Sequence, residues 1–235
     1  MAAPRGADAA LVEAVRRGLA ARADRAKAPA MQAYMKSAMP YRGVATPGMR
    51  ALCREVYGAT RLASFAAWRD TILALWRGAA FREERYAALE LAGHRFYRDH
   101  QTMTALPLYE TLIVDGAWWD YVDTIATHRL PEILAAAPAP MRTAMRAWAR
   151  SGDLWKRRSA ILCQLPCKRA TDLALLADCL APSLDARDFF LRKAIGWALR
   201  EYAKTDPAFV RRYVRQHADR LSPLSQREAL RRFTA

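Results

Sequence analysis

Residues 193–204 read KAIGWALREYAK, and this stretch decides the fold more clearly than any other. Ala, Leu, Lys and Arg fill most of its positions, and these residues have high helix propensity. The same composition extends over 187–204 and predicts one helix there. Gly196 in the helix interior costs about 1 kcal/mol relative to Ala. It therefore indicates close approach by another helix or by a ligand beside Trp197.

The same helical signal recurs in both directions along the chain. The sequence has only 10 glycines, and few segments alternate Val, Ile or Thr with polar residues, so no strand is predicted. Asp153, Asp206 and Ser222 stand where N-terminal caps would be. The other helices are expected at 8–27, 31–38, 48–57, 64–76, 81–99, 104–114, 118–127, 131–137, 140–150, 154–165, 170–180, 207–217 and 223–233.

Many short helices with short connections favour helix pairs stacked side by side. The predicted fold class is all-α, a HEAT-like α–α superhelical repeat solenoid in which each pair buries its apolar face against its neighbours. Trp119, Trp155 and Trp197 are separated by 36 and 42 residues, near the ~40-residue period of HEAT-type units. The length of 235 residues suits one domain, so we expect a single repeat domain over 1–235.

The chain is strongly basic. It has 38 Lys and Arg residues against 23 Asp and Glu residues, a formal net charge of +15. This surplus could serve solubility alone, but it points more often to a polyanion, with nucleic acid as the first candidate and an acidic membrane surface as the second. We find no apolar leader near the N-terminus and no run of ~18 apolar residues, so neither a signal peptide nor a membrane span is expected.

The cysteines and histidines indicate no metal site. No CxxC pair occurs and no histidine stands at a zinc-finger spacing, so the thiols are expected to be small buried hydrophobes in a reducing cytoplasm. The sequence predicts neither a metal nor another cofactor, and a metal-dependent nuclease is disfavoured. The residues concerned are Cys53, Cys163, Cys167, Cys179, His94, His100, His128 and His217.

Two short segments carry candidate chemistry. Trp119 and Asp123 are four residues apart and would share one helix face, with an aromatic surface beside a carboxylate. In the second segment, the apolar run 160–162 would anchor the helix and leave the basic residues 156–158 facing solvent or a polyanion. Each residue also has a plainer interpretation, because such tryptophans are often core and such charges are often solvated or capping. The pattern alone indicates a basic helical scaffold with one aromatic–acidic site.

These segments resemble the AlkD-type family of DNA alkylation repair glycosylases. The resemblance spans nearly the whole chain in order, and the match over 193–205 is the most specific part of it. The matching stretches are MQAYMK at 31–36, GVATP at 43–47, WWDYVD at 118–123, WKRRSAILCQL at 155–165, KAIGWALREYAKT at 193–205 and PLSQREA at 223–229.

The resemblance implies a HEAT-like superhelix that cradles duplex DNA in a concave basic groove. It implies a hydrolase of base excision repair, which cleaves the N-glycosidic bond of cationic N3- and N7-alkylated purines. The family's motif places the catalytic residues on Asp123, Trp119 and Trp197 and a phosphate contact on Arg158. Further DNA-binding residues are expected at Tyr34, Lys156, Arg157 and Lys193.

The family further implies a monomer in the cytoplasm, associated with the nucleoid, whose partner is duplex DNA containing alkylated bases. A non-catalytic HEAT-like module that binds damaged or branched DNA is the alternative. The Trp119–Asp123 pair disfavours this alternative, since a binding module has no need for a carboxylate that repels phosphates.

Overall fold

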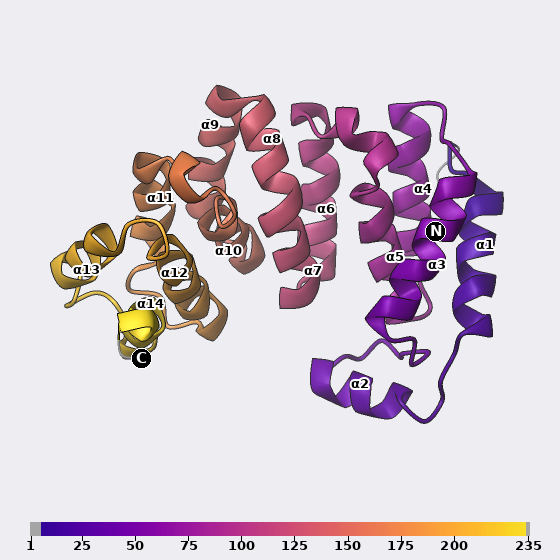
Figure 1. Cartoon of the computed structure of the whole chain (residues 1–235), viewed down its shortest axis with the longest axis horizontal. Helices are drawn as coiled ribbons and strands as arrows, with labels where there is room; N and C mark the ends of the chain where they lie inside the picture. The colour runs from indigo at the N-terminus through magenta and orange to yellow at the C-terminus, as the bar shows by residue number, and fades with distance from the viewer. Residues whose placement is uncertain (1–5, 234–235) are drawn as a thin grey trace. The chain divides into compact units, whose positions relative to one another are not determined.

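The computed structural model describes residues 6–233, and that part of the chain contains helices and no strand. The chain divides into two compact units, with the boundary between His100 and Gln101. The single repeat domain expected over 1–235 stays a prediction. The helices of unit 1 are α1 (Ala9–Ala21), α2 (Ala28–Met35), α3 (Thr46–Ala59), α4 (Phe65–Arg77), α5 (Arg82–Ala92) and the short 3-10 helix η1 (Arg95–His100) (Figure 1).

Unit 2 contains the longer series of helices. In chain order these are η2 (Met103–Ala105), α6 (Leu106–Gly116), α7 (Trp119–Thr124), η3 (Ile125–Arg129), α8 (Leu130–Ala136), α9 (Pro138–Ala149), α10 (Leu154–Leu162), η4 (Lys168–Ala170), α11 (Leu173–Leu180), η5 (Ala181–Ser183), α12 (Phe189–Tyr202), α13 (Pro207–Gln216), α14 (Pro223–Leu230) and η6 (Arg231–Phe233) (Figure 1). The segment η3 is a π-helical turn, in which the Leu130 N–H binds the Ile125 carbonyl five residues back.

The predicted all-α class with HEAT-like, solenoid-type repeats is confirmed. Most helices match their predicted ranges within a few residues, with two differences. The helix expected over 8–27 ends at Ala21, because the Asp24 carboxylate accepts hydrogen bonds from the Ala26 and Lys27 N–H groups and favours a turn. The helix expected over 81–99 ends at Ala92, with Gly93 as its cap.

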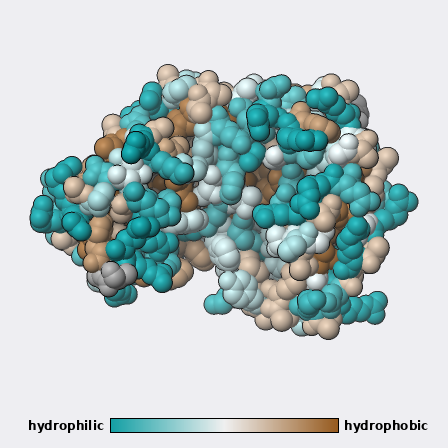
Figure 2. Space-filling model, viewed as in Figure 1, coloured by the Kyte–Doolittle hydropathy of each residue, from teal (hydrophilic) through white to brown (hydrophobic). Residues whose placement is uncertain are grey.

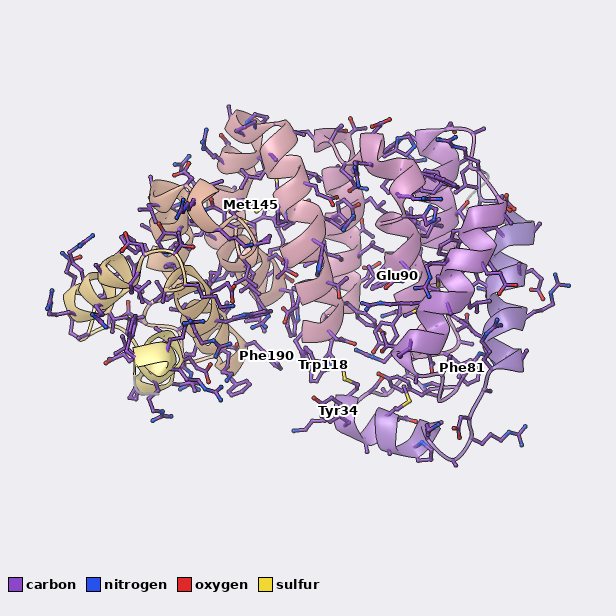
Figure 3. The ribbon with its side chains drawn as sticks, in the orientation of Figure 1. Tyr34, Phe81, Glu90, Trp118, Met145 and Phe190 are labelled. Carbon is purple, nitrogen blue, oxygen red and sulfur yellow. The ribbon has the colours of Figure 1, made fainter. Side chains whose placement is uncertain are left out.

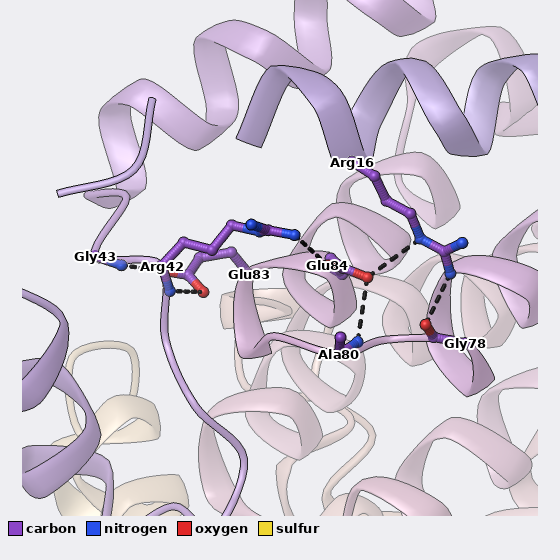
Figure 4. Close-up of polar contacts among 7 residues, drawn as sticks. All are labelled: Arg16, Arg42, Gly43, Gly78, Ala80, Glu83 and Glu84. Atoms are coloured by element: carbon purple, nitrogen blue, oxygen red, sulfur yellow. Dashed lines mark hydrogen bonds and ion pairs between the residues drawn. The ribbon is translucent and has the colours of Figure 1, made fainter. Parts of the chain in front are cut away.

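In unit 1, two buried carboxylates at the start of α5 bind the loop that contains residues 42–44. Glu83 is 1% exposed and accepts hydrogen bonds from the N–H groups of Arg42, Gly43 and Val44 at 2.9–3.1 Å (Figure 4). Gly43 has φ 83°, and a Cβ at this position would lie 1.9 Å from the Asp24 carbonyl oxygen. Only glycine therefore fits there.

The neighbouring Glu84 is equally buried and joins three segments. It pairs with Arg16 of α1 and with Arg42 of the loop, each at 3.3 Å, and accepts a hydrogen bond from the Ala80 N–H (Figure 4). Buried charges are tolerated when they are paired and hydrogen-bonded in this way. Glu83 and Glu84 thus have structural partners within unit 1.

In unit 2, α10 packs against α7, α9, α11 and α12, and α12 packs against α14. The predicted caps at Asp153, Asp206 and Ser222 are confirmed, because each side chain accepts a hydrogen bond from the first turn of its helix. Gly196 lies where α14 approaches α12. A Cβ on Gly196 would come within 2.4 Å of Glu228 Cβ, so the predicted close approach is that of another helix.

The surface carries many hydrophilic side chains (Figure 2), and three of the cysteine thiols are buried. On the face drawn in Figure 2, hydrophilic side chains predominate and hydrophobic ones form scattered patches. Within residues 6–233 no helix has the length and apolar character needed to cross a membrane. Cys53, Cys163 and Cys179 are buried, as predicted, but Cys167 is half-buried. Burial raises the pKa of the Cys53 and Cys179 thiols to about 12.

Candidate active site

Asp123 of α7 forms a two-pronged ion pair with Arg158 of α10. Arg158 Nε donates to Asp123 Oδ1 at 2.7 Å, and Nη2 donates to Oδ2 at 2.8 Å. The two side chains are 14% and 6% exposed, respectively. Burial raises the pKa of Asp123 above its ordinary value, and the hydrogen bonds and positive charge of Arg158 oppose this rise.

Arg158 also connects α10 to the start of α12. Its Nη1 donates to the Phe190 carbonyl at 2.5 Å, so all three guanidinium nitrogens have partners within the protein. The sequence interpretation that residues 156–158 all face outward is therefore wrong for Arg158, which is 5% exposed. Arg158 lies five residues after the Asp153 N-cap of α10, and its bonds to Asp123 and to the α12 carbonyl turn it inward.

An aromatic cluster borders this ion pair. Trp118, Trp155 and Phe190 lie with their ring centroids 5.0–6.3 Å apart, and Trp118 and Phe190 are labelled in Figure 3. Trp155 is only 7% exposed. It therefore belongs to the core, which is the position that such tryptophans often take. Trp118 is half-buried, and within residues 6–233 no hydrogen-bond acceptor faces its Nε1. The Arg158 guanidinium carbon lies 5.9 Å from the centroid of the Phe190 ring, so the cluster adjoins the ion pair.

The two tryptophans expected to act in catalysis occupy different helices of unit 2. Trp119 lies one turn before Asp123 on α7, and Trp197 lies on α12. Both are half-buried, which leaves part of each ring open to a ligand. Asp123 stands near the end of α7, directly before the π turn η3, and its carbonyl accepts a hydrogen bond from Thr127 Oγ1 at 2.7 Å. Such turns occur often at functional sites.

The residues expected to bind DNA differ in what they contact. Lys156 pairs with Glu110 at 2.5 Å, and Lys193 pairs with Glu228 at 2.8 Å. Arg157 donates hydrogen bonds to Ser183 Oγ and the Pro182 carbonyl at 2.9 and 3.0 Å. In unit 1, Tyr34 of α2 is 77% exposed and is available to a partner (Figure 3). The DNA contacts of all four residues stay predictions.

Sequence reasoning missed the part that α12 takes in this site. Phe190 contributes both a ring to the aromatic cluster and the carbonyl that holds Arg158. The available signal was the doublet Phe189-Phe190 directly after Asp188, whose carboxylate caps the helix by accepting from the Phe190 N–H at 2.7 Å. Within residues 6–233, no group of three or more His, Cys, Asp or Glu side chains is placed to hold a metal ion.

The chain matches one protein family in sequence and is similar in fold to a solved structure. The model of the DNA alkylation repair enzyme family matches residues 15–233. A solved structure described as a predicted DNA alkylation repair enzyme from Enterococcus faecalis is 27% identical, with a TM-score of 0.80 over 89% of this chain and 95% of that one. No curated protein matches the sequence significantly. Since the family model covers nearly all of the chain, this protein belongs to the DNA alkylation repair enzyme family.

Proposed function

We propose that this protein is a DNA glycosylase that hydrolyses the N-glycosidic bond of cationic N3- and N7-alkylated purines in duplex DNA. Membership of the family supports a role in the repair of alkylation damage. The finer proposal rests on one observation, the partly buried carboxylate of Asp123 that Arg158 holds in a fixed orientation. We infer that Asp123 is the catalytic group and that Trp119 and Trp197 bind the substrate beside it.

The geometry leaves Asp123 able to act on a substrate. A carboxylate offers about four lone-pair positions, and Arg158 uses one on each oxygen. The remaining positions can accept a hydrogen bond from an attacking water. The partial burial of this carboxylate strengthens the interaction of its negative charge with a developing cation.

The chemistry needs no second carboxylate. Cleavage of the glycosidic bond builds positive charge on the sugar, which a carboxylate stabilises while it orients water. An alkylated purine that already carries a positive charge departs as a neutral base, so it needs no proton from a general acid. The faces of Trp119 and Trp197 suit such a substrate, because aromatic rings attract cations.

A non-catalytic module that binds damaged or branched DNA is the second candidate. One observation favours it, namely that the positive charge of Arg158 already balances Asp123. A balanced ion pair stabilises a developing cation less than a free carboxylate does. For catalysis to follow, an incoming DNA phosphate would have to compete for the Arg158 guanidinium.

Release of free base separates the two candidates. The purified protein is incubated with a duplex that contains one N7-methylguanine, and free base is measured by chromatography against a reaction without enzyme. The glycosylase predicts release above the spontaneous rate. Binding without such release would support the module, and tighter binding to a four-way junction than to a linear duplex would identify branched DNA as its partner.

A further inference from the structure

The outward face of α13 carries three exposed arginines. Val210, Tyr213 and Val214 are buried against the protein, whereas Arg211, Arg212 and Arg215 are exposed. We call these three arginines the α13 basic face. Figure 1 shows α13 beside α12 and α14, and in the same view the surface at this end of unit 2 is hydrophilic (Figure 2).

Within residues 6–233, no carboxylate forms an ion pair with Arg211, Arg212 or Arg215, and the neighbouring Arg220 is paired with Asp185. Arg211 and Arg215 are four residues apart, and like charges at this spacing destabilise a helix. Arg215 in the last turn compensates the helix dipole, but Arg211 and Arg212 in the middle do not. An external anion would remove this repulsion.

Two of these side chains lie beside aromatic rings. The Arg211 guanidinium carbon lies 4.3 Å from the centroid of Phe233, and that of Arg212 lies 5.8 Å from the centroid of Phe209. A guanidinium that is positioned in advance loses less entropy when it forms the paired hydrogen bonds that phosphate accepts. Arginines that lie beside aromatic rings and form no ion pair with a carboxylate therefore suit a row of phosphates.

We propose that the α13 basic face binds the phosphate backbone of duplex DNA, as a contact additional to the Asp123–Arg158 site. The partner class rests on the proposed function, which makes duplex DNA the substrate. The face offers three guanidinium groups to phosphate oxygens, and contacts to phosphates carry no sequence information. Its role is to hold undamaged duplex as well as damaged duplex.

The test measures affinity for undamaged duplex as a function of salt. The triple variant R211A/R212A/R215A is compared with R17A/R54A/R98A, which removes three exposed arginines from unit 1 and so lowers the net charge equally. Each phosphate contact contributes about −0.9 to the log–log slope of affinity against salt. We expect the slope to become shallower by about 2–3 in the α13 variant and to change much less in the control variant.

Two results would overturn this proposal. Equal changes of slope in both variants would mean that net charge alone matters. An unchanged slope together with lost binding to phosphatidylserine vesicles would assign the α13 basic face to an acidic membrane surface. Because the duplex is undamaged, the outcome does not depend on base release, and failure of the glycosylase proposal would be seen separately in the free-base assay.

Discussion

The guanidinium of Arg158 binds both carboxylate oxygens of Asp123, a residue 35 positions earlier in the chain. The pair fixes the direction of the carboxylate, and it neutralises a charge that burial disfavours. Asp123 is therefore held in one orientation, and in the proposed reaction its strength as a catalyst depends on how firmly Arg158 stays attached to it.

Replacing Asp123 with Asn should abolish most excision while binding to alkylated duplex persists. A carboxylate ~4 Å from the developing sugar cation contributes about 4 kcal/mol at an effective dielectric of ~20, or roughly a thousandfold in rate. Single-turnover release of N7-methylguanine measures the loss, and titration of the same duplex measures binding. Asp120→Asn, on the same helix, is the control. Equal loss in both variants would show that the catalytic carboxylate is elsewhere.

The pH dependence of excision should reflect the raised pKa of Asp123. In the proposed reaction the ionised form of Asp123 is the active one, and burial raises its pKa above the ordinary aspartate value of 3.8. The carboxylate is therefore lost at a higher pH than an exposed aspartate would be, and excision falls as the pH decreases through that raised pKa. A profile of single-turnover rate against pH, corrected for release without enzyme, measures it. An acid limb at or below 3.8 would contradict the assignment.

Arg158→Ala tests whether this arginine is a phosphate contact, a structural partner or both. Removing one member of a buried ion pair costs about 3–5 kcal/mol, so the thermal midpoint should fall clearly. If Arg158 also contacts a phosphate, the salt slope of duplex binding becomes shallower by about one. Arg158→Lys retains the charge but not the paired geometry, and it should recover part of the stability. A loss of stability with an unchanged slope would leave Arg158 a structural role alone.

Trp119→Ala and Trp197→Ala should impair excision while the circular-dichroism spectrum and the thermal midpoint stay near wild type. Both residues are partly exposed, so their removal costs less packing than removal of a fully buried tryptophan does. Trp155→Ala is the contrasting variant, because Trp155 is 7% exposed and packs against Trp118 and Phe190. That variant should lose about 3–5 kcal/mol of unfolding free energy. Unfolding of either half-buried variant would identify that tryptophan as core.

Two glycine substitutions should have opposite effects on stability. Gly196→Ala would place a Cβ 2.4 Å from Glu228 Cβ and 3.1 Å from the Ser225 carbonyl oxygen, so α14 must shift. Overpacking of this kind costs about 1–3 kcal/mol. Gly58→Ala meets nothing within 4 Å and lies inside α3, so it should stabilise by up to about 1 kcal/mol. Urea unfolding of both variants measures the difference, and equal signs would contradict the packing.

The local part of this structure could be predicted from the sequence, and the long-range part could not. Caps at Asp153 and Asp206, and the close approach at Gly196, follow from residue types that act on their own neighbourhood. The inward turn of Arg158 depends on Asp123, which is distant in sequence, and on a backbone carbonyl of α12. Every residue has a backbone carbonyl, so no residue pattern indicates which of them will bind Arg158.

The same limit explains why the buried carboxylates of unit 1 were missed. Glu83 sits in the first turn of α5, where an acidic residue is ordinary. Its partners are backbone N–H groups some 40 residues earlier, which every sequence possesses at every position. For the candidate site, the sequence identified Trp119, Asp123 and Arg158 as notable residues, but the direct bond between the latter two required the fold.

The π turn at Ile125–Arg129 can be created or removed by inserting or deleting a single residue. Such a turn contains one residue more than the α-helical turn it replaces, and each residue of an α-helix advances about 100° around the axis. Deleting one codon within η3 would let α7 and α8 run on as one regular helix, and Asp123 would rotate away from Arg158 while α8 kept its packing. A single insertion or deletion could thus have switched this carboxylate into or out of use, with the rest of the scaffold inherited unchanged.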